Sequence, residues 1–224
     1  KTLDRGLENR EIVLDILMEV LERGSFVHMV LNQALDKYQY LDKADRAFIT
    51  RLTEGTLEYL IQIDAIINQY SKTKTQKMKP VIRNLLRLSV YQILHMDRVP
   101  DSAVCNEAVK LAQKKGFYNL KPFVNGVLRT IAREMDQVRF PQKEDDLLKY
   151  LSVKYSMPEV LVTRWLEAYG EETTEKILAD FLTEHPLTIR CRTYLNSKEE
   201  IVKSLESQGV HVAPAPYLPY AYSI

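Results

Sequence analysis

Cysteine, glycine and long apolar runs are all scarce in this sequence. The two cysteines, Cys105 and Cys191, do not have the spacing of a metal site, and a disulfide framework is not expected. The seven glycines do not cluster. No run of about 18 apolar residues is present, so no transmembrane helix is predicted. The charged start, residues 1–10, lacks the apolar core of a secretory signal, and we expect a cytoplasmic protein that does not bind membranes.

Acidic residues are scarce in one part of the chain. Residues 65–133 carry 13 Lys and Arg against 3 Asp and Glu, whereas residues 1–64 carry 8 against 12 and residues 134–224 carry 10 against 15. No acidic residue stands between Asp64 and Asp97. Such asymmetry indicates either a polyanionic partner or a solvated basic face.

The first 135 residues are predicted to form an all-α bundle. Apolar residues recur at helical spacing in four segments, residues 7–22, 27–38, 44–59 and 60–70. Pro80 opens a helix to Met96 that is apolar almost all round, which predicts a central position in the bundle. Two more helices end near Lys115 and Met135, and no strand pattern occurs in this region.

Four helix ends carry recognisable signals. Gly24 and Gly116 are expected to stop helices, and Asp42 is expected to cap the helix that follows it. Asp101 or Ser102 is the expected cap of the next helix after Pro100.

Beyond the bundle the pattern changes twice. Residues 139–184 are predicted to be a helical linker with short helices at 145–154, 158–169 and 171–182. Leu187–Tyr194 alternates with period two, Ser197 caps a helix to Ser207, and a second strand starts at Val210. We therefore expect a bundle over 1–138, a linker over 139–184, and an incomplete α/β (RRM-like) domain over 185–224, the chain stopping before a sheet is completed.

Several sequence blocks carry a family resemblance. Their order is LTEGTL at Leu52, KPVIRNLLRLSVYQIL at Lys79, DRVP at Asp97, NEAVKLA at Asn106 and FVNGVLR at Phe123. This set resembles the NusB-like RNA-binding domain of Sun-type ribosomal RNA cytosine-5 methyltransferases. WLEAYG at Trp165 and TIR at Thr188 resemble the segments that follow in that family.

The resemblance implies transfer of a methyl group from S-adenosylmethionine to cytosine C5 through a cysteine nucleophile. Neither Cys105 nor Cys191 lies in the family's Pro-Cys or Thr-Cys motif, and no glycine-rich turn follows a predicted strand. We therefore assign no catalytic residue and no bound cofactor to residues 1–224. We expect this segment to be inactive alone, and the whole enzyme to require S-adenosylmethionine. Both cysteines are expected to be core residues.

We call residues 65–133 the basic region, and eleven of its cations are the candidate RNA-binding residues. They are Lys72, Lys74, Lys77, Lys79, Arg83, Arg87, Lys110, Lys114, Lys121, Arg129 and Arg133.

Arg83 and Arg87 have a second interpretation. They share one face of an apolar helix, so one or both could pair with Glu54 or Glu107 instead of with phosphate.

Asn125 and Gly126 are expected to form a packing notch between helices. Tyr70, Tyr91 and Tyr118 flank the basic region and could stack on bases, although core packing is favoured for Tyr91. The four histidines are scattered, and no metal site is predicted.

The function that fits best is RNA binding that positions a methyltransferase on small-subunit ribosomal RNA. A transcription antitermination factor of the NusB type is an alternative, and residues 140–224 argue against it. A helical protein–protein docking module that presents its basic region to an acidic partner is the other alternative.

Overall fold

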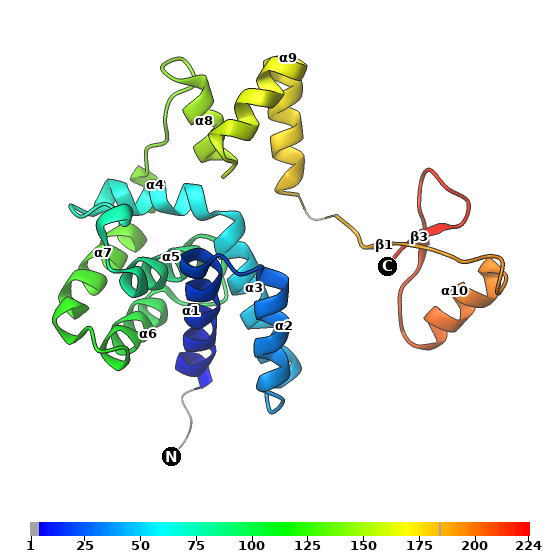
Figure 1. Ribbon diagram of the computed structural model, residues 1–224, viewed down its shortest axis with the longest axis horizontal. Helices are drawn as coiled ribbons and strands as arrows, with labels where there is room; N and C mark the ends of the chain where they lie inside the picture. Colours follow the sequence, from blue (N-terminus) through cyan, green and yellow to red (C-terminus); the bar gives the residue numbers. More distant parts are fainter. Residues whose placement is uncertain (1–4, 184) are drawn as a thin grey trace. The chain divides into compact units, whose positions relative to one another are not determined.

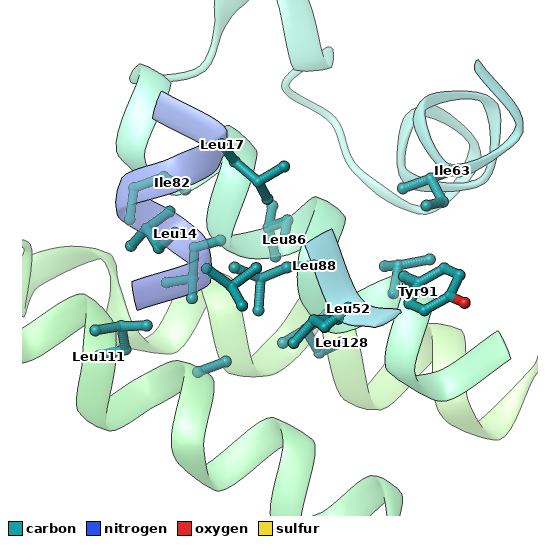
Figure 2. Packing of buried hydrophobic residues seen from close by; sticks show 14 of the residues in the cluster. Leu14, Leu17, Leu52, Ile63, Ile82, Leu86, Leu88, Tyr91, Leu111 and Leu128 are labelled. Carbon is teal, nitrogen blue, oxygen red and sulfur yellow. The ribbon is translucent and has the colours of Figure 1, made fainter. Parts of the chain in front are cut away.

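Helix α5 (Pro80–His95) lies at the centre of the helical part of the molecule, as its apolar pattern predicts (Figure 1). It packs against α1, α3, α4, α6 and α7. Figure 2 shows Leu86 and Leu88 of α5 gathered with leucines of the surrounding helices. Burial of these apolar side chains is the main stabilising contribution to such a bundle.

The computed structural model describes residues 5–183 and 185–224. The chain divides into two compact units, the first ending at Leu178 and the second comprising Ala179–Ile224. The expected boundaries after residues 138 and 184 stay predictions. The other bundle helices are α1 (Arg5–Arg23), α2 (Val27–Lys37), α3 (Lys43–Glu58), α4 (Leu60–Tyr70), α6 (Asp101–Lys114) and α7 (Lys121–Arg133).

The helix ends follow the expected signals with one exception. Gly24 and Gly116 have φ of 77° and 86°, a conformation that favours glycine, and they follow α1 and α6. The carboxylate of Asp42 accepts the amide of Asp45 at 2.8 Å and so caps α3. The expected cap of α6 was wrong: Pro100 is its N-cap, and no side chain caps this end.

Gly55 of α3 allows a close approach between two helices. A β-carbon built at this position would lie 2.1 Å from the ring of Tyr91 on α5. Tyr91 is 4% exposed, which confirms the core position expected for it. The block LTEGTL therefore contains a steric requirement: only glycine lets the Tyr91 ring pack against α3.

Two linker helices follow the bundle within the first unit. Helices α8 (Leu147–Lys154) and α9 (Glu159–Phe181) have a small core of their own around Leu151, Val162 and Leu178. Helix α9 changes direction at Gly170, where φ is 75° and ψ is 175°, so it consists of the two helices expected from the sequence.

A carboxylate network stabilises this linker. The carboxylate of Glu175 accepts hydrogen bonds from the ammonium of Lys143 at 3.0 Å, the ammonium of Lys154 at 3.1 Å and the hydroxyl of Tyr155 at 3.0 Å. The hydrogen bond from Lys143 is the largest influence, and together these donors lower the pKa of Glu175 to about 2.

The linker is fastened to the bundle by reciprocal helix capping. The hydroxyl of Ser156 accepts the amides of Ile61 and Gln62 at 3.1 and 3.5 Å, at the first turn of α4. In return, the side-chain amide of Gln62 donates to the carbonyls of Val153 and Lys154 at 3.4 and 3.0 Å, at the last turn of α8. Each helix thus satisfies free backbone groups at the end of the other.

The second unit is a small sheet with one helix. Strands β1 (Thr188–Arg190), β2 (Ala213–Pro214) and β3 (Ala221–Ser223) form an antiparallel sheet in the order β1-β3-β2. Helix α10 (Lys198–Ser207) begins with the expected capping box between Ser197 and Glu200. This arrangement confirms a small α/β unit after the bundle.

The strand predictions needed correction. Strand β1 is shorter than the alternating segment Leu187–Tyr194, and β2 starts three residues after Val210. Strand β3 was not predicted, because its three residues follow a proline-rich segment and show no alternation of their own. Its central place in the sheet depends on long-range pairing, which local pattern does not reveal.

Candidate nucleic-acid interface

The loop between α4 and α5, residues 71–79, has a defined shape because its buried residues anchor it. The amide of Thr75 donates to the side-chain carbonyl of Asn68 at 2.7 Å, and the hydroxyl of Ser71 donates to the carbonyl of Thr73 at 2.7 Å. Ser71, Thr75 and Met78 are buried. The short 3-10 helix η1 (Thr75–Lys77) follows the anchor.

Four lysines on this loop are exposed, and we call them the loop lysines: Lys72, Lys74, Lys77 and Lys79. The ammonium of Lys74 donates to the carbonyl of Asn68 at 2.6 Å, which leaves its charge uncompensated. Within the described part of the chain, no carboxylate lies within 4.0 Å of any loop lysine ammonium. A shaped loop with four such charges is suited to contacts with phosphate groups.

The two arginines of α5 have a different environment. Arg83 pairs with Glu22 of α1 at 2.6 Å, and its side chain is 17% exposed. Arg87 forms a two-bond fork with Asp64 of α4, at 2.8 and 2.6 Å, and its side chain is 10% exposed. The expected partners Glu54 and Glu107 were wrong, because the carboxylates facing this side of α5 come from α1 and α4.

Asn84 connects the two arginine pairs. Its amide nitrogen donates to Glu22 at 2.8 Å, and its carbonyl accepts from Arg87 at 2.9 Å. Burial alone would raise the pKa of Glu22, but the hydrogen bonds from Arg83 and Asn84 outweigh it and hold this pKa below its usual value. Because both guanidiniums are largely buried and neutralised, we leave Arg83 and Arg87 out of the proposed interface.

Ion pairs also occupy the cations at the end of α6. Lys114 pairs with Glu11 of α1, and Lys115 lies 3.2 Å from Glu11 and 2.7 Å from Asp15. Burial would raise the pKa of Glu11, yet hydrogen bonds from the two lysines leave it lowered. The acidic first region and the basic second region of the sequence thus partly neutralise each other across the α1–α6 contact.

A groove of about 790 Å³ between α6 and α7 holds a second group of cations. Lys110 and Lys121 line it together with Arg129. Lys110 pairs with Glu107 at 2.7 Å on the same helix, while Lys121 and Arg129 donate to the neutral side chains of Gln113 and Asn125. The charges of Lys121 and Arg129 therefore stay available at the groove.

Tyr118 is the aromatic residue of this groove region that faces solvent. It is 64% exposed, and the ammonium of Lys121 lies 4.5 Å from its ring centroid. An exposed ring beside a cation can stack on an unpaired base while the cation contacts the backbone. Tyr70 instead donates its hydroxyl to the carbonyl of Glu134 at 3.0 Å, next to Arg133.

Arg133, at the end of α7, is 71% exposed and pairs with the neighbouring Glu134 at 2.7 Å. Such an exposed pair is weak, so Arg133 stays a candidate for phosphate contact.

The expected packing notch at Asn125 and Gly126 was wrong. A β-carbon built at Gly126 would meet nothing within 4 Å, and Asn125 lines the α6–α7 groove.

Neither cysteine is placed for chemistry. Cys105 and Cys191 are 2% and 6% exposed, as expected for core residues, and burial raises the pKa of the Cys105 thiol. None of the three strands is followed by a glycine-rich turn, so the described residues do not fit a site for S-adenosylmethionine.

The described residues contain neither a metal-binding cluster nor a membrane-spanning helix. No group of three or more His, Cys, Asp or Glu side chains gathers in a way that could hold a metal ion. None of the described helices combines the length and apolar character needed to cross a bilayer.

Two family descriptions match the chain. Residues 7–133 match the NusB family, and residues 157–224 match the Methyltr_RsmF/B-like, ferredoxin-like domain. The first match covers helices α1 to α7, and the second covers α9 and the sheet of the second unit.

Relatives of two kinds are similar to the chain. A probable ribosomal RNA small subunit methyltransferase B of Bacillus subtilis is 32% identical over 203 residues, 91% of this chain and 44% of the relative. The transcription antitermination protein NusB of Acidothermus cellulolyticus is 38% identical over 123 residues, 54% of this chain and 83% of the relative. The chain thus spans less than half the length of the methyltransferase relative.

A solved structure agrees with the fold of the bundle. A chain in the crystal structure of antitermination factors NusB and NusE in complex with dsRNA has a TM-score of 0.53 and 21% identity. The match covers 59% of this chain and 98% of that chain.

Proposed function

Because the chain belongs to the NusB family, and its second unit matches a domain of RsmF/B-like methyltransferases, we propose that it binds ribosomal RNA and positions a methyltransferase domain on it. The observation that carries the proposal is the set of loop lysines, four uncompensated cations on an anchored loop. Lys121, Arg129 and Arg133 extend this surface along α6 and α7, while Lys110 and Lys114 contribute less because Glu107 and Glu11 pair with them.

The finer parts of the proposal rest on two sources. The similarity to the methyltransferase relative over 91% of the chain supports small-subunit ribosomal RNA as the substrate. The resemblance of the sequence blocks implies that the modified atom is C5 of cytosine and that the methyl donor is S-adenosylmethionine, bound by residues other than those described. The role of the present residues is binding and orientation, because a helical domain that holds the RNA raises the effective concentration of the target base at a catalytic domain.

Antitermination is a second candidate, favoured by the 38% identity to the Acidothermus protein. The ferredoxin-like match over residues 157–224 favours the methyltransferase reading instead. Ion pairs that already occupy several cations weaken the docking-module alternative without removing it, since the loop lysines could also face an acidic protein.

Crosslinking the chain to RNA in cells, followed by sequencing of the bound RNA, tests the proposal. We expect enrichment of small-subunit ribosomal RNA, and a large loss of it when Lys74, Lys77 and Lys79 are replaced by alanine. A matched variant, Lys37→Ala with Arg164→Ala and Lys176→Ala, removes the same charge elsewhere and should retain the enrichment. Enrichment of nascent transcript leaders would favour antitermination, and absence of bound RNA would favour docking to a protein.

A further inference from the structure

A second groove, of about 840 Å³, lies between the bundle and the linker. Helix α4 contributes one wall, and the segment leading into α8 contributes the other; Figure 1 shows α8 beside α4. Gln69 and Gln76 line the groove together with Asn68, whose side-chain amide is bonded to Thr75. Arg139 and Lys149 line its opposite wall. The volume lies in the range of pockets that hold a small ligand, roughly 300–1,000 Å³, so a nucleotide fits.

Hydrogen bonds fix both walls of this groove. The side-chain carbonyl of Gln69 accepts the amide of Arg139 at 3.1 Å. The reciprocal capping between Ser156 and Gln62 holds the end of α8 against the start of α4. The groove is therefore a preformed feature, and binding there does not require the linker to be ordered first.

The charge of the groove is positive. Arg139 and Lys149 are exposed, and in the ranges the structure describes no carboxylate lies within 4.0 Å of either charged group. Asp64 is the carboxylate among the lining residues, and the fork from Arg87 neutralises it. An anion that enters the groove thus meets two free cations and amide donors.

The groove continues the surface formed by the loop lysines. Gln76 belongs to η1, between Lys74 and Lys77. The ammonium of Lys74 contacts the backbone of Asn68, which also lines the groove. An RNA backbone bound to the loop lysines therefore passes directly to the groove.

The acidic turn before α8 limits where such an RNA strand can enter and end. Glu144, Asp145 and Asp146 are exposed and precede Lys149 by one turn, but they do not line the groove. Because they repel phosphate, a strand enters from the loop side and ends before this turn.

We propose that this groove binds a single-stranded segment of the RNA, adjacent to the part held by the loop lysines. Arg139 and Lys149 contact phosphates, and the amides of Gln69 and Gln76 contact base edges or sugars, which requires unpaired bases. The proposal rests on the RNA-binding function proposed above and adds two residues, Arg139 and Lys149, that lie outside the basic region of the sequence.

Two RNA probes test it with the full chain: a small-subunit ribosomal RNA hairpin, and the same hairpin with a short single-stranded tail. We expect the tail to tighten binding about tenfold. Arg139→Gln with Lys149→Gln abolishes this gain, and its salt slope on the tailed RNA becomes shallower by about 1.4, at about 0.7 per lost single-strand phosphate contact. Arg139→Lys with Lys149→Arg retains the gain, as does the matched control Lys37→Gln with Arg164→Gln.

The outcomes separate this proposal from the proposed function. If the hairpin binds through the loop lysines but the tail adds nothing, or if the double Gln variant keeps the gain, the groove is not an RNA site and the proposed function stands. If neither probe binds the unaltered chain, the proposed function fails as well. Circular dichroism confirms that the exposed double variant stays folded.

Discussion

Helix α5 carries buried, paired cations, whereas the loop that precedes it carries exposed, unpaired ones. Arg83 and Arg87 on the helix are mostly buried and paired with carboxylates of α1 and α4. The loop lysines, which start eleven residues before Arg83 at Lys72, are exposed and have no carboxylate within 4.0 Å in the described chain. Positive charge in a sequence thus indicates a polyanion-binding surface only when the cations that form internal ion pairs are not counted.

The largest expected effect comes from breaking the Arg87 pair. Arg87→Met leaves the carboxylate of Asp64 and the side-chain carbonyl of Asn84 without a partner, and removing one member of a buried pair should lower the free energy of unfolding by about 3 kcal/mol. The double variant Arg87→Met with Asp64→Leu should recover most of this loss. Urea denaturation followed by circular dichroism measures both. Unchanged stability in the single variant would mean that the pair is not structural.

Gly55, which packs against a buried ring, and Gly126, which is exposed, allow a second comparison between buried and exposed positions. Gly55→Ala places a β-carbon 2.1 Å from the Tyr91 ring and should destabilise the bundle by about 1–3 kcal/mol. Gly126→Ala lies on the exposed face of α7 and should stabilise it by about 0.5–1 kcal/mol. Thermal unfolding of the two variants compares them directly, and a loss of stability in Gly126→Ala would restore the packing notch.

His95 is the third basic side chain of α5, and its titration should make stability depend on pH. This is the smallest of the expected effects. Burial is the main reason that its pKa is lowered from 6.5, and the charge of Arg51 adds to this. The unfolded chain therefore takes up a proton before the folded one does, so stability falls as pH drops below about 6.5 and levels off below the folded pKa.

Urea midpoints at pH 8 and at about pH 5.5 isolate this effect, because carboxylates titrate mainly below that range. His95→Gln should remove the difference, and the exposed control His28→Gln should retain it. A difference that survives in His95→Gln would place the titrating group elsewhere.

Local signals in the sequence predicted most of the helix ends and the central helix of the bundle. Proline at the start of α5, glycine after α1 and α6, and the caps at Asp42 and Ser197 act through their own backbone conformation or through hydrogen bonds a few residues away. Apolar periodicity located α5 at the centre because a helix that is apolar all round must be surrounded.

Long-range features were not predictable in this way. Glu22 is 61 residues from Arg83, and nothing in the local pattern distinguishes it from Glu54. Strand β3 pairs with two strands but has only three residues and no alternation. Arg139 and Lys149 were missed because nearby acidic residues cancel their charge in the sequence, although those acids do not line the groove.

The salt dependence of RNA affinity, measured for three proteins, tests most directly whether the loop lysines bind RNA while the α5 arginines do not. These are the unaltered chain, Lys74→Ala with Lys77→Ala and Lys79→Ala, and the Arg87→Met with Asp64→Leu variant. We predict that the slope of log affinity against log salt is shallower by about 2–3 in the triple variant, at roughly 0.7–0.9 per phosphate contact, and unchanged in the α5 variant. An unchanged slope in the triple variant together with a shallower slope in the α5 variant would contradict the division between exposed binding cations and buried structural ones.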